Sequence, residues 1–284
     1  MERKRLDLLL VEKGYFPSRQ KAQSAIMAGR VLVDGQKKEK AGVLVPVDAE
    51  ITVTGEDLPY VSRGGLKLAK ALAVFPVDPA GKTALDVGAS TGGFTDCLLQ
   101  HGAKRVIAVD VGYGQLAWKL RQDPRVKVME RTNIRYLTPA DLGEELVDLV
   151  TVDVSFISLR LVLPAVIALA KEAADFILLV KPQFEAGRDK VGKHGVVRDP
   201  QVHRQVLTAV IEEAEKLGLQ ARGLDFSPIK GPEGNIEYLL WLTHAGNAEP
   251  LSRDRIEDVV QQAHASLQQS KQFPEKRQDR THED

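Results

Sequence analysis

The sequence predicts an α/β protein whose main part is a doubly wound, mostly parallel sheet. Between Lys82 and Thr243, apolar runs of strand length alternate with segments of helical periodicity, as crossover connections between parallel strands require. The first run leads into a turn of small residues, 88–93, and Phe94 then opens a helical pattern. A strand, a glycine-rich turn and a helix N-terminus together form a cofactor-binding unit in this class of fold.

The last two apolar runs close the sheet in the opposite direction. Only a turn, from Pro228 to Asn235, separates them, and it is too short for a crossover helix, so this pair must be antiparallel. Seven strands with the last one antiparallel are the arrangement of the methyltransferase variant of the Rossmann-like fold. The predicted strands are 82–87, 105–110, 126–129, 147–153, 175–181, 220–227 and 236–243.

A small α+β module is predicted to precede the sheet, over residues 1–58. Its helices are indicated by capping residues and its strands by apolar runs around Asp34-Gly35, a strong signal for a two-residue hairpin. The expected elements are a helix from Arg5 to Val11 capped by Gly14, a helix from Ser18 to Ala28 ended by Gly29, and short strands at 31–33, 43–47 and 50–53.

The charge of this module is uneven, although the whole chain has no net charge. Residues 1–40 hold ten Lys and Arg against five Asp and Glu, which suits one anion-binding face. Many ordinary domains show such an imbalance, so incidental surface charges stay an alternative. The residues singled out for contact with an RNA backbone are Arg5, Arg19, Lys21 and Arg30.

A connector, residues 59–62, joins the module to the main part of the chain, residues 63–246. The first helix of this part is expected to bury Leu66, Ala69 and Leu72 or Ala73, which share one face. On this periodicity alone, Lys67 is a surface residue. The remaining residues, 247–284, form a strongly polar tail with one amphipathic helix at 256–267 and a disordered end from Gln272.

The glycine-rich turn discriminates between cofactors. A dinucleotide fingerprint needs glycine at the first, third and sixth positions of the turn, and these are Gly88, Ser90 and Gly93 here. The glycine that admits a pyrophosphate is therefore missing. Asp86 at the strand end would repel a phosphate but hold an ammonium, and the amino-acid end of S-adenosylmethionine carries one. We expect S-adenosylmethionine in this turn, rather than a dinucleotide or no ligand.

Two later strand ends extend this predicted cofactor site. Asp110 ends the second apolar run, about where an acidic residue takes up ribose hydroxyls in this fold. Asn133 follows the third strand, beside the expected adenine position, and an ordinary loop role is equally compatible with it. The residues expected to hold the cofactor are Asp86, Gly88, Ser90, Gly92, Gly93, Phe94, Thr95, Asp110, Asn133 and Asp153.

Charged residues at further strand ends are candidates for chemistry, because reactive groups collect beyond the carboxyl ends of parallel strands. Asp153 ends the fourth strand and Lys181 the fifth. They could form a simple salt bridge. Alternatively, they could position a hydroxyl nucleophile for methyl transfer, because partial burial among other cations shifts the lysine towards its neutral form. Glu237 enters the last strand, where an edge position facing water and a functional role are equally compatible with the sequence.

A long basic loop, residues 185–198, follows Lys181. Loops of this length in a compact domain are commonly functional. We interpret it as an RNA backbone clamp carrying Arg188, Lys190 and Lys193, with a merely mobile loop as the alternative.

Several classes of protein are disfavoured by what the sequence lacks. No apolar run approaches the roughly 18 residues of a membrane span, and the charged N-terminus is not a signal peptide. Cys97 is the only cysteine, which excludes an intrachain disulfide, and the six histidines are scattered. We expect a cytoplasmic protein with no metal and no membrane partner, while the sequence leaves its oligomeric state open.

Two known families resemble this chain. The pattern of the first 50 residues resembles the αL RNA-binding domain first recognised in a small-subunit ribosomal protein. Lys67, Asp153, Lys181 and Glu237 lie in the order and contexts of the Lys-Asp-Lys-Glu tetrad of FtsJ-type ribose 2′-O-methyltransferases. The stretches around them are similar to the TlyA family of rRNA cytidine 2′-O-methyltransferases, often labelled haemolysin-like. These stretches are Ser62–Leu68, Asp86–Cys97, Asp153–Leu159 and Lys181–Glu185.

The resemblance implies an S-adenosylmethionine-dependent enzyme that methylates the ribose of cytidine in ribosomal RNA, of the 16S type, the 23S type or both, as free RNA or in a ribosomal subunit. Lys181 would serve as base or hydrogen-bond acceptor for the 2′-hydroxyl, with Asp153 orienting it. Lys67 and Glu237 would help to place the hydroxyl in line with the methyl group. The alternatives are a membrane-active haemolysin-like protein and a non-catalytic rRNA-binding assembly factor.

Overall fold

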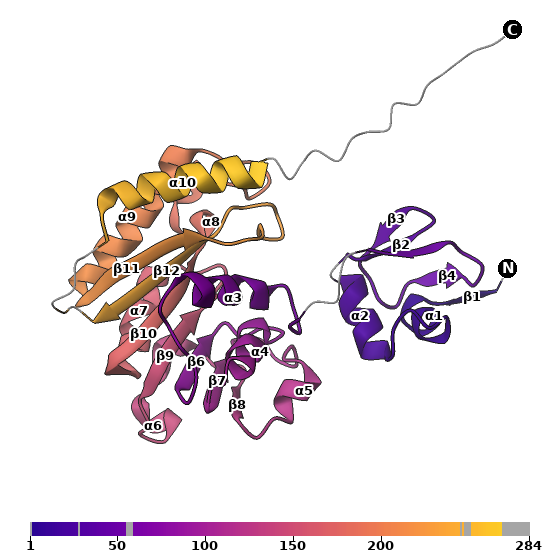
Figure 1. The fold of residues 1–284 in the computed structure, drawn as a ribbon, viewed down its shortest axis with the longest axis horizontal. Coiled ribbons are helices and arrows are strands. Elements are labelled where there is room, and N and C mark those ends of the chain that lie inside the picture. Colours follow the sequence, from indigo (N-terminus) through magenta and orange to yellow (C-terminus); the bar gives the residue numbers. More distant parts are fainter. Residues whose placement is uncertain (1, 28, 55–58, 245, 247–250, 269–284) are drawn as a thin grey trace, which may run out of the picture.

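The computed structural model describes all residues except 1, 28, 55–58, 245, 247–250 and 269–284. A small N-terminal part stands beside a larger α/β body (Figure 1). The larger body is built on one seven-stranded sheet. Its strands are β6 (Thr83–Val87), β7 (Arg105–Val109), β8 (Val126–Met129), β9 (Val147–Val152), β10 (Ala170–Val180), β11 (Leu219–Phe226) and β12 (Tyr238–His244).

The order of the strands is β11-β12-β10-β9-β6-β7-β8. Neighbours from β8 to β10 are parallel, whereas β12 is antiparallel to both β10 and β11. The predicted class of fold and the reversed last strand are thus confirmed. The main difference is at β10, which begins at Ala170 rather than at residue 175.

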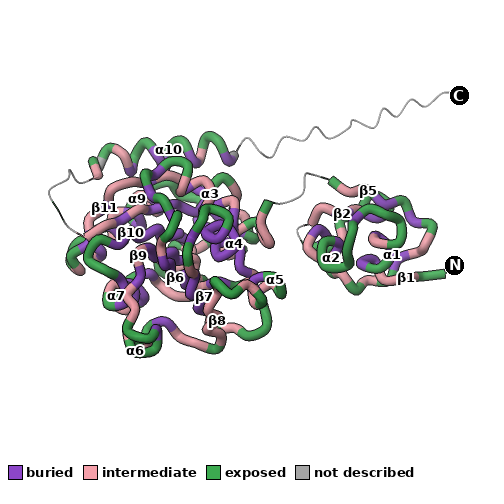
Figure 2. The backbone as a smooth tube through the Cα atoms, turned by 60° about the horizontal axis from the view of Figure 1, so that its bottom comes forward, coloured by how far each residue is buried: buried purple, intermediate pink, exposed green. Residues whose placement is uncertain are grey.

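Helices cover both faces of the sheet, because successive strand residues alternate between two hydrophobic clusters. One face carries α3 (Gly64–Val74), α4 (Gly93–Gln100) and α5 (Trp118–Arg121). The other carries α7 (Leu163–Ala168), α9 (Pro200–Lys216) and α10 (Arg253–Gln268). Buried residues concentrate along the strands between these layers (Figure 2).

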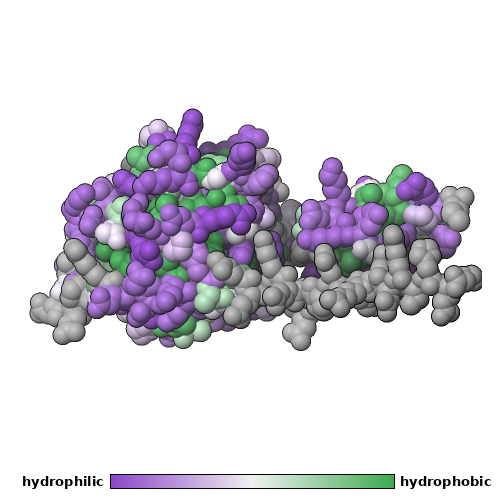
Figure 3. Space-filling view, turned by 90° about the horizontal axis from the view of Figure 1, so that it is seen from above, coloured by the Kyte–Doolittle hydropathy of each residue, from purple (hydrophilic) through white to green (hydrophobic). Residues whose placement is uncertain are grey.

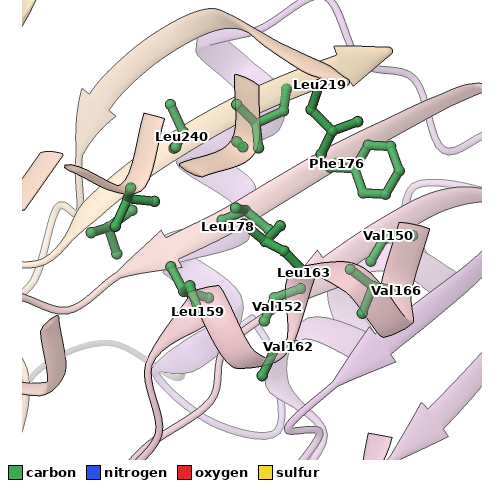
Figure 4. Close-up of a cluster of buried hydrophobic side chains, with 14 of the residues drawn as sticks. Val150, Val152, Leu159, Val162, Leu163, Val166, Phe176, Leu178, Leu219 and Leu240 are labelled. Atoms are coloured by element: carbon green, nitrogen blue, oxygen red, sulfur yellow. The ribbon is translucent and has the colours of Figure 1, made fainter. Parts of the chain in front are cut away.

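The core on the α7 side is a close contact between aliphatic side chains. Leu163 and Val166 of α7 lie against the strand residues Val150, Val152 and Leu178 (Figure 4). Each such side chain is almost fully buried, and burial of one contributes roughly 1.5–3 kcal/mol. This packing fixes the strand ends on which the charged residues stand.

The buried face of α3 differs from the prediction. Lys67, Leu68 and Ala71 point inward, whereas Leu66 and Ala69 are only half-buried. Periodicity counts a lysine as polar and therefore placed the apolar face one residue away. Lys67 is buried because it meets a carboxylate inside the body, as described below.

The N-terminal part has its own core, formed by residues such as Leu6, Leu10 and Ile26. The helices predicted there are confirmed, but Arg5 belongs to a short strand before the first helix. The predicted hairpin is also present, with both turn residues at positive φ, Asp34 at 50° and Gly35 at 72°. The elements are β1 (Arg3–Arg5), α1 (Leu6–Glu12), α2 (Arg19–Met27), β2 (Val31–Val33), β3 (Gln36–Lys38), β4 (Leu44–Pro46) and β5 (Ile51–Val53). These form two small antiparallel sheets, β1-β4 and β3-β2-β5.

The helix predicted in the tail is α10, and it packs on the body through a stripe that includes Ile256, Val259 and Ala263. On the face seen from above, hydrophilic side chains surround smaller hydrophobic areas (Figure 3). Among the helices that the structure describes, none has the length and apolar character needed to span a membrane. The end expected to be disordered, from Gln272, lies outside the described residues.

Candidate active site

Four charged residues from distant parts of the chain meet at the carboxyl edge of the sheet. Asp153 follows β9 and Lys181 follows β10, while Glu237 directly precedes β12. Because β12 is antiparallel, its beginning lies at the same edge as the ends of its neighbours, and Val180 pairs with Tyr238. Lys67 reaches this edge from α3.

These residues form two ion pairs. The Lys67 ammonium donates to Glu237 Oε2 at 2.6 Å, and Lys181 Nζ lies 2.6 Å from Asp153 Oδ1. Lys181 also donates to Ser155 Oγ at 2.9 Å. The angles of the Asp153 contact are not those of a hydrogen bond, so this buried Oδ1 has no hydrogen-bond partner among the described residues.

The carboxylate of Glu237 interacts electrostatically with members of both ion pairs. Burial raises the pKa of its carboxyl group, and the charges of Lys67 and Lys181 act in the opposite direction. The carboxylate of Asp153 raises the pKa further. The four side chains therefore share one electrostatic environment, and none of them occupies the water-facing position that the sequence left open for Glu237 and Lys67.

The pairs adjoin a cavity with a volume of 240 Å³. Its lining includes Gly88, Ser90 and Gly93 of the glycine-rich turn together with one residue of each ion pair, Lys67 and Asp153. A molecule held by the turn would thus lie directly beside these two charged residues. The Asp153 carboxylate in the lining fits a ligand that carries a positive charge.

The glycines of the turn are required by backbone shape and by close approach. Gly88 has φ of 85°, and a Cβ there would lie 2.5 Å from the carbonyl oxygen of Asp153. A Cβ at Gly93 would lie 2.7 Å from the backbone nitrogen of Gly65, because α3 and α4 touch at this point. Gly92 begins α4 in the left-handed region, with φ of 98°. Ser90 also has a positive φ, of 50°.

Asp86 is not among the residues that line this cavity, and a cofactor contact by Asp86 or Thr95 stays a prediction. Its side chain is fully buried on the α4 side of the sheet and accepts hydrogen bonds from Thr95 Oγ1 at 2.6 Å and Thr151 Oγ1 at 3.3 Å. Burial raises the pKa of Asp86 to about 7. Thr95 is likewise buried, so the two residues support the turn from behind rather than lining the cavity.

Asp110 and Asn133 stabilise loops near the turn. The Asp110 carboxylate accepts hydrogen bonds from the backbone N–H groups of Ser90 at 2.7 Å and Gly112 at 2.6 Å. Asn133 Oδ1 accepts the N–H of Arg135 at 3.1 Å and caps a 3₁₀ turn, η1 (Ile134–Tyr136). Asn133 thus has the loop role left open above, and a cofactor contact by either residue stays a prediction.

Three of the basic residues singled out in the N-terminal part have partners inside it, and one of them, Arg30, donates to the Thr54 carbonyl at 3.0 Å. Arg5 makes two hydrogen bonds to the buried Asp7 carboxylate, at 3.0 and 2.9 Å, and Arg19 makes one at 2.9 Å. The bonds from Arg5, Gln23 and Arg19 hold the pKa of Asp7 well below its usual range. Arg5 and Arg19 therefore stabilise this part, a role that the sequence analysis did not assign to them.

Arg30 and the other basic residues lie on surfaces. Lys21 and Arg30 line a groove of 520 Å³ between the N-terminal part and the body, together with Lys119 of the body. Arg188, Lys190 and Lys193 are exposed on the segment after Lys181. This segment contains two short helices, α8 (Pro182–Glu185) and η3 (Arg188–Lys190).

The sequence analysis missed Phe156, which lies in the same connection as Asp153. Its φ is 64°, a conformation that bulky residues rarely adopt, and the side chain is 89% exposed. The ring lies 5.0 Å from that of Phe184, the ring that Lys181 approaches. An aromatic residue in a run such as Val154-Ser155-Phe156 looks like core, so its exposure could not be read from the pattern.

Within the part of the chain that the structure describes, no group of three or more His, Cys, Asp or Glu is arranged to hold a metal ion. The polar groups of the site are instead lysines, carboxylates and the hydroxyl of Ser155. Such groups bind and orient a polar reactant and move protons.

The order of the strands, the reversed β12 and the glycine-rich turn together define a methyltransferase with a Rossmann-like sheet. Comparison with known families makes this more specific. Residues 60–244 match the FtsJ-like methyltransferases, and residues 4–51 match the S4 domain. The chain belongs to the FtsJ-like methyltransferase family.

Similar proteins extend over almost the whole chain. "Putative rRNA methyltransferase YqxC" of Bacillus subtilis is 53% identical, over 95% of this chain and 97% of that protein. "16S/23S rRNA (cytidine-2'-O)-methyltransferase TlyA" of Mycobacterium tuberculosis is 50% identical, over 92% and 97% respectively. Among solved structures, "Putative hemolysin from Streptococcus thermophilus" is 46% identical with a TM-score of 0.76, covering 95% of this chain and 98% of that one.

Proposed function

We propose that this protein transfers the methyl group of S-adenosylmethionine to the ribose 2′-hydroxyl of a cytidine in ribosomal RNA. The observation that carries the proposal is the shared cavity, in which the glycine-rich turn faces Lys67 and Asp153. A methyl donor held by the turn and a hydroxyl held by the charged residues would meet there. The names of the 50–53% identical relatives support the rRNA and cytidine parts of the proposal.

The methyl donor would supply a methyl group on a positively charged sulfur. Gly88, Ser90 and Gly93 would hold it, with Asp110 and Asn133 near its nucleoside part. On the protein side, the Lys181 side chain, once it has lost a proton, would accept the hydrogen bond of the 2′-hydroxyl or take up its proton. Asp153 and Ser155 orient the Lys181 ammonium, and holding both reactants in line supplies most of the acceleration.

The Lys67–Glu237 pair would position the sugar. Its 2.6 Å contact is buried, so neither side chain can turn towards bulk water without leaving an unpaired charge, which is strongly unfavourable. The pair therefore presents a fixed donor and a fixed acceptor beside Lys181. A hydroxyl group requires both in order to be oriented.

RNA would bind across both parts of the chain. Lys21, Arg30 and Lys119 line the groove between them, and Arg188, Lys190 and Lys193 extend beyond the catalytic residues. Lysine and arginine side chains at such positions bind phosphates without reading sequence. We propose an RNA-binding domain at 1–58, a linker at 59–62, a methyltransferase domain at 63–246 and a polar tail at 247–284, in a cytoplasmic protein.

The target nucleobase would lie on Phe156. This ring is exposed, adjoins Lys181 through Phe184, and is held in an unfavourable backbone conformation. Strain of this kind often marks a functional site. Stacking of one base on an aromatic side chain contributes about 1–3 kcal/mol.

Replacing this ring should separate activity from stability. Phe156→Gly is expected to lower kcat/KM for methyl transfer about tenfold or more, because the stacking surface is lost. The melting temperature should stay nearly unchanged, since glycine relieves the strain at φ of 64° while adding freedom to the unfolded chain. Leu161→Ala, an exposed residue of the same connection, is the control and should keep full activity. Full activity in Phe156→Gly would exclude the stacking role.

The direct test supplies the purified protein with S-adenosylmethionine carrying a radiolabelled methyl group and with rRNA or isolated ribosomal subunits. We expect label on RNA, and mapping should locate it on the ribose of a cytidine, where it blocks alkaline cleavage of the adjacent bond. Label on a base or on protein, or no label on any of these substrates, would contradict the proposal.

The two alternatives make different predictions for the same preparation. A membrane-active protein releases dye from liposomes in the absence of donor and RNA. A non-catalytic assembly factor binds rRNA but gives no heat when titrated with S-adenosylmethionine. We expect no dye release and a measurable heat of donor binding.

A further inference from the structure

Most of the basic loop, here the basic segment 187–198, is held near the beginning of β12 by a buried amide side chain. Asn235 is 1% exposed and lies two residues before Glu237. Its Nδ2 donates to the carbonyl of Gly195 at 2.8 Å, and its Oδ1 accepts the N–H of Val197 at 3.0 Å. Both sides of the amide are therefore used by the same three-residue stretch, Gly195–Val197.

A histidine holds this stretch from the other side. His203 of α9 is fully buried, and its Nε2 lies 3.0 Å from the carbonyl oxygen of Val197. A carbonyl only accepts, so Nε2 carries the hydrogen and Nδ1 accepts from the Tyr238 hydroxyl at 2.7 Å. His264 Nε2 of α10 lies 3.2 Å from the same Nδ1. Burial lowers the pKa of His203 to about 4, which keeps this pattern intact at neutral pH.

Asn235 and Tyr238, the hydrogen-bond partner of His203, flank Glu237 in the sequence. The other end of the basic segment continues from Lys181 through α8. The segment thus connects the Lys181 end of β10 to the start of the strand that carries Glu237, and its cations Arg188 and Lys193 remain exposed. Its further contact, from Lys190 to Gln205 at 2.8 Å, is on the surface.

We propose that Asn235 and His203 are positioning residues that hold the basic segment in register with the Lys67–Glu237 pair. RNA bound to the cations of the segment then presents its ribose at a fixed distance from Lys181. This inference rests on the proposed function. Its physical basis is that a small displacement of a bound reactant lowers the rate by a large factor.

The test is a double-mutant cycle in RNA affinity, measured without donor by fluorescence anisotropy on labelled rRNA fragments. Arg188→Ala alone should weaken binding several-fold by loss of a phosphate contact, and Asn235→Ala alone should weaken it by displacing the segment. In the double variant, Arg188→Ala should add little to Asn235→Ala, because a displaced segment has already lost its contact. Residues that act as one unit are non-additive in this way.

Turnover provides the second readout. Asn235→Ala is expected to lower kcat roughly tenfold, with donor affinity unchanged in calorimetry. His203→Gln should lower kcat in the same direction, and it replaces Asn235→Ala in the cycle if that variant does not fold. Gln205→Ala removes only the exposed contact of the segment, and it should leave both RNA affinity and kcat unchanged.

Fully additive losses in the cycle would overturn the inference, as would wild-type kcat and RNA affinity in Asn235→Ala. The proposed function fails separately, if the wild-type protein transfers no methyl group to any rRNA substrate. The binding cycle does not depend on that reaction and still decides whether the segment is positioned by Asn235.

Discussion

Lys181→Ala is expected to reduce methyl transfer by roughly 10²- to 10⁴-fold, the range supplied by a positioned acid–base group. The reason is that Lys181, held by its ion pair with Asp153 and its hydrogen bond to Ser155, lies at the proposed hydroxyl site. Donor binding should remain largely intact, because the glycine-rich turn lines the cavity and Lys181 is not among its lining residues. Initial rates with labelled donor and calorimetric titration measure the two effects.

A lysine near the other end of β10 provides a matched control. Lys171 lies near the beginning of this strand, whereas Lys181 directly follows its end, and Lys171 pairs at the surface with Asp148. Lys171→Ala removes the same kind of side chain and should keep full turnover. If Lys181→Ala also keeps near-full turnover, the assignment of Lys181 to the hydroxyl is wrong.

Gly88→Ala should weaken donor binding and, with it, methyl transfer. The added Cβ would lie 2.5 Å from the Asp153 carbonyl oxygen, which is backbone and cannot swing aside. Relief requires the turn and the Asp153 loop to move apart, so both walls of the cavity are displaced. We expect the donor Kd to rise at least about tenfold and the free energy of unfolding to fall by about 1–3 kcal/mol.

Gly81→Ala is the control for backbone strain alone. Gly81 also has a positive φ, of 71°, but a Cβ there would meet nothing within 4 Å. That variant should lose about 1 kcal/mol of stability and bind the donor as the wild type does. Equal donor affinities in the two variants would show that close approach at Gly88 does not shape the cavity.

Whether the position of a residue could be predicted from the sequence depended on whether its partner is close to it in the chain. The reversal of β12 was predictable because the short turn before it admits no other connection. The inward position of Lys67 was not predictable from periodicity, since its partner Glu237 is 170 residues away. Strand alternation put Asp86 behind the turn, although its place at the strand end suggested a ligand contact.

The sequence analysis did not identify residues whose partners are backbone groups. Asn235 and His203 bind main-chain atoms of Gly195 and Val197, and no side-chain pattern signals such contacts. Arg5 and Arg19 were predicted to contact RNA, and the structure adds a structural role, because both also bind the buried Asp7 carboxylate. Mutating these arginines would therefore test folding of the N-terminal part before it tests RNA binding.

The position of β12 has a consequence for the order in which the molecule matures. This strand is the last of the sheet to be synthesised, yet it lies between β10 and β11 rather than at an edge. Until it inserts, Lys67 has no carboxylate opposite it and the interior of the sheet is open. Any chain that has not yet been synthesised as far as β12 therefore lacks the Lys67–Glu237 pair.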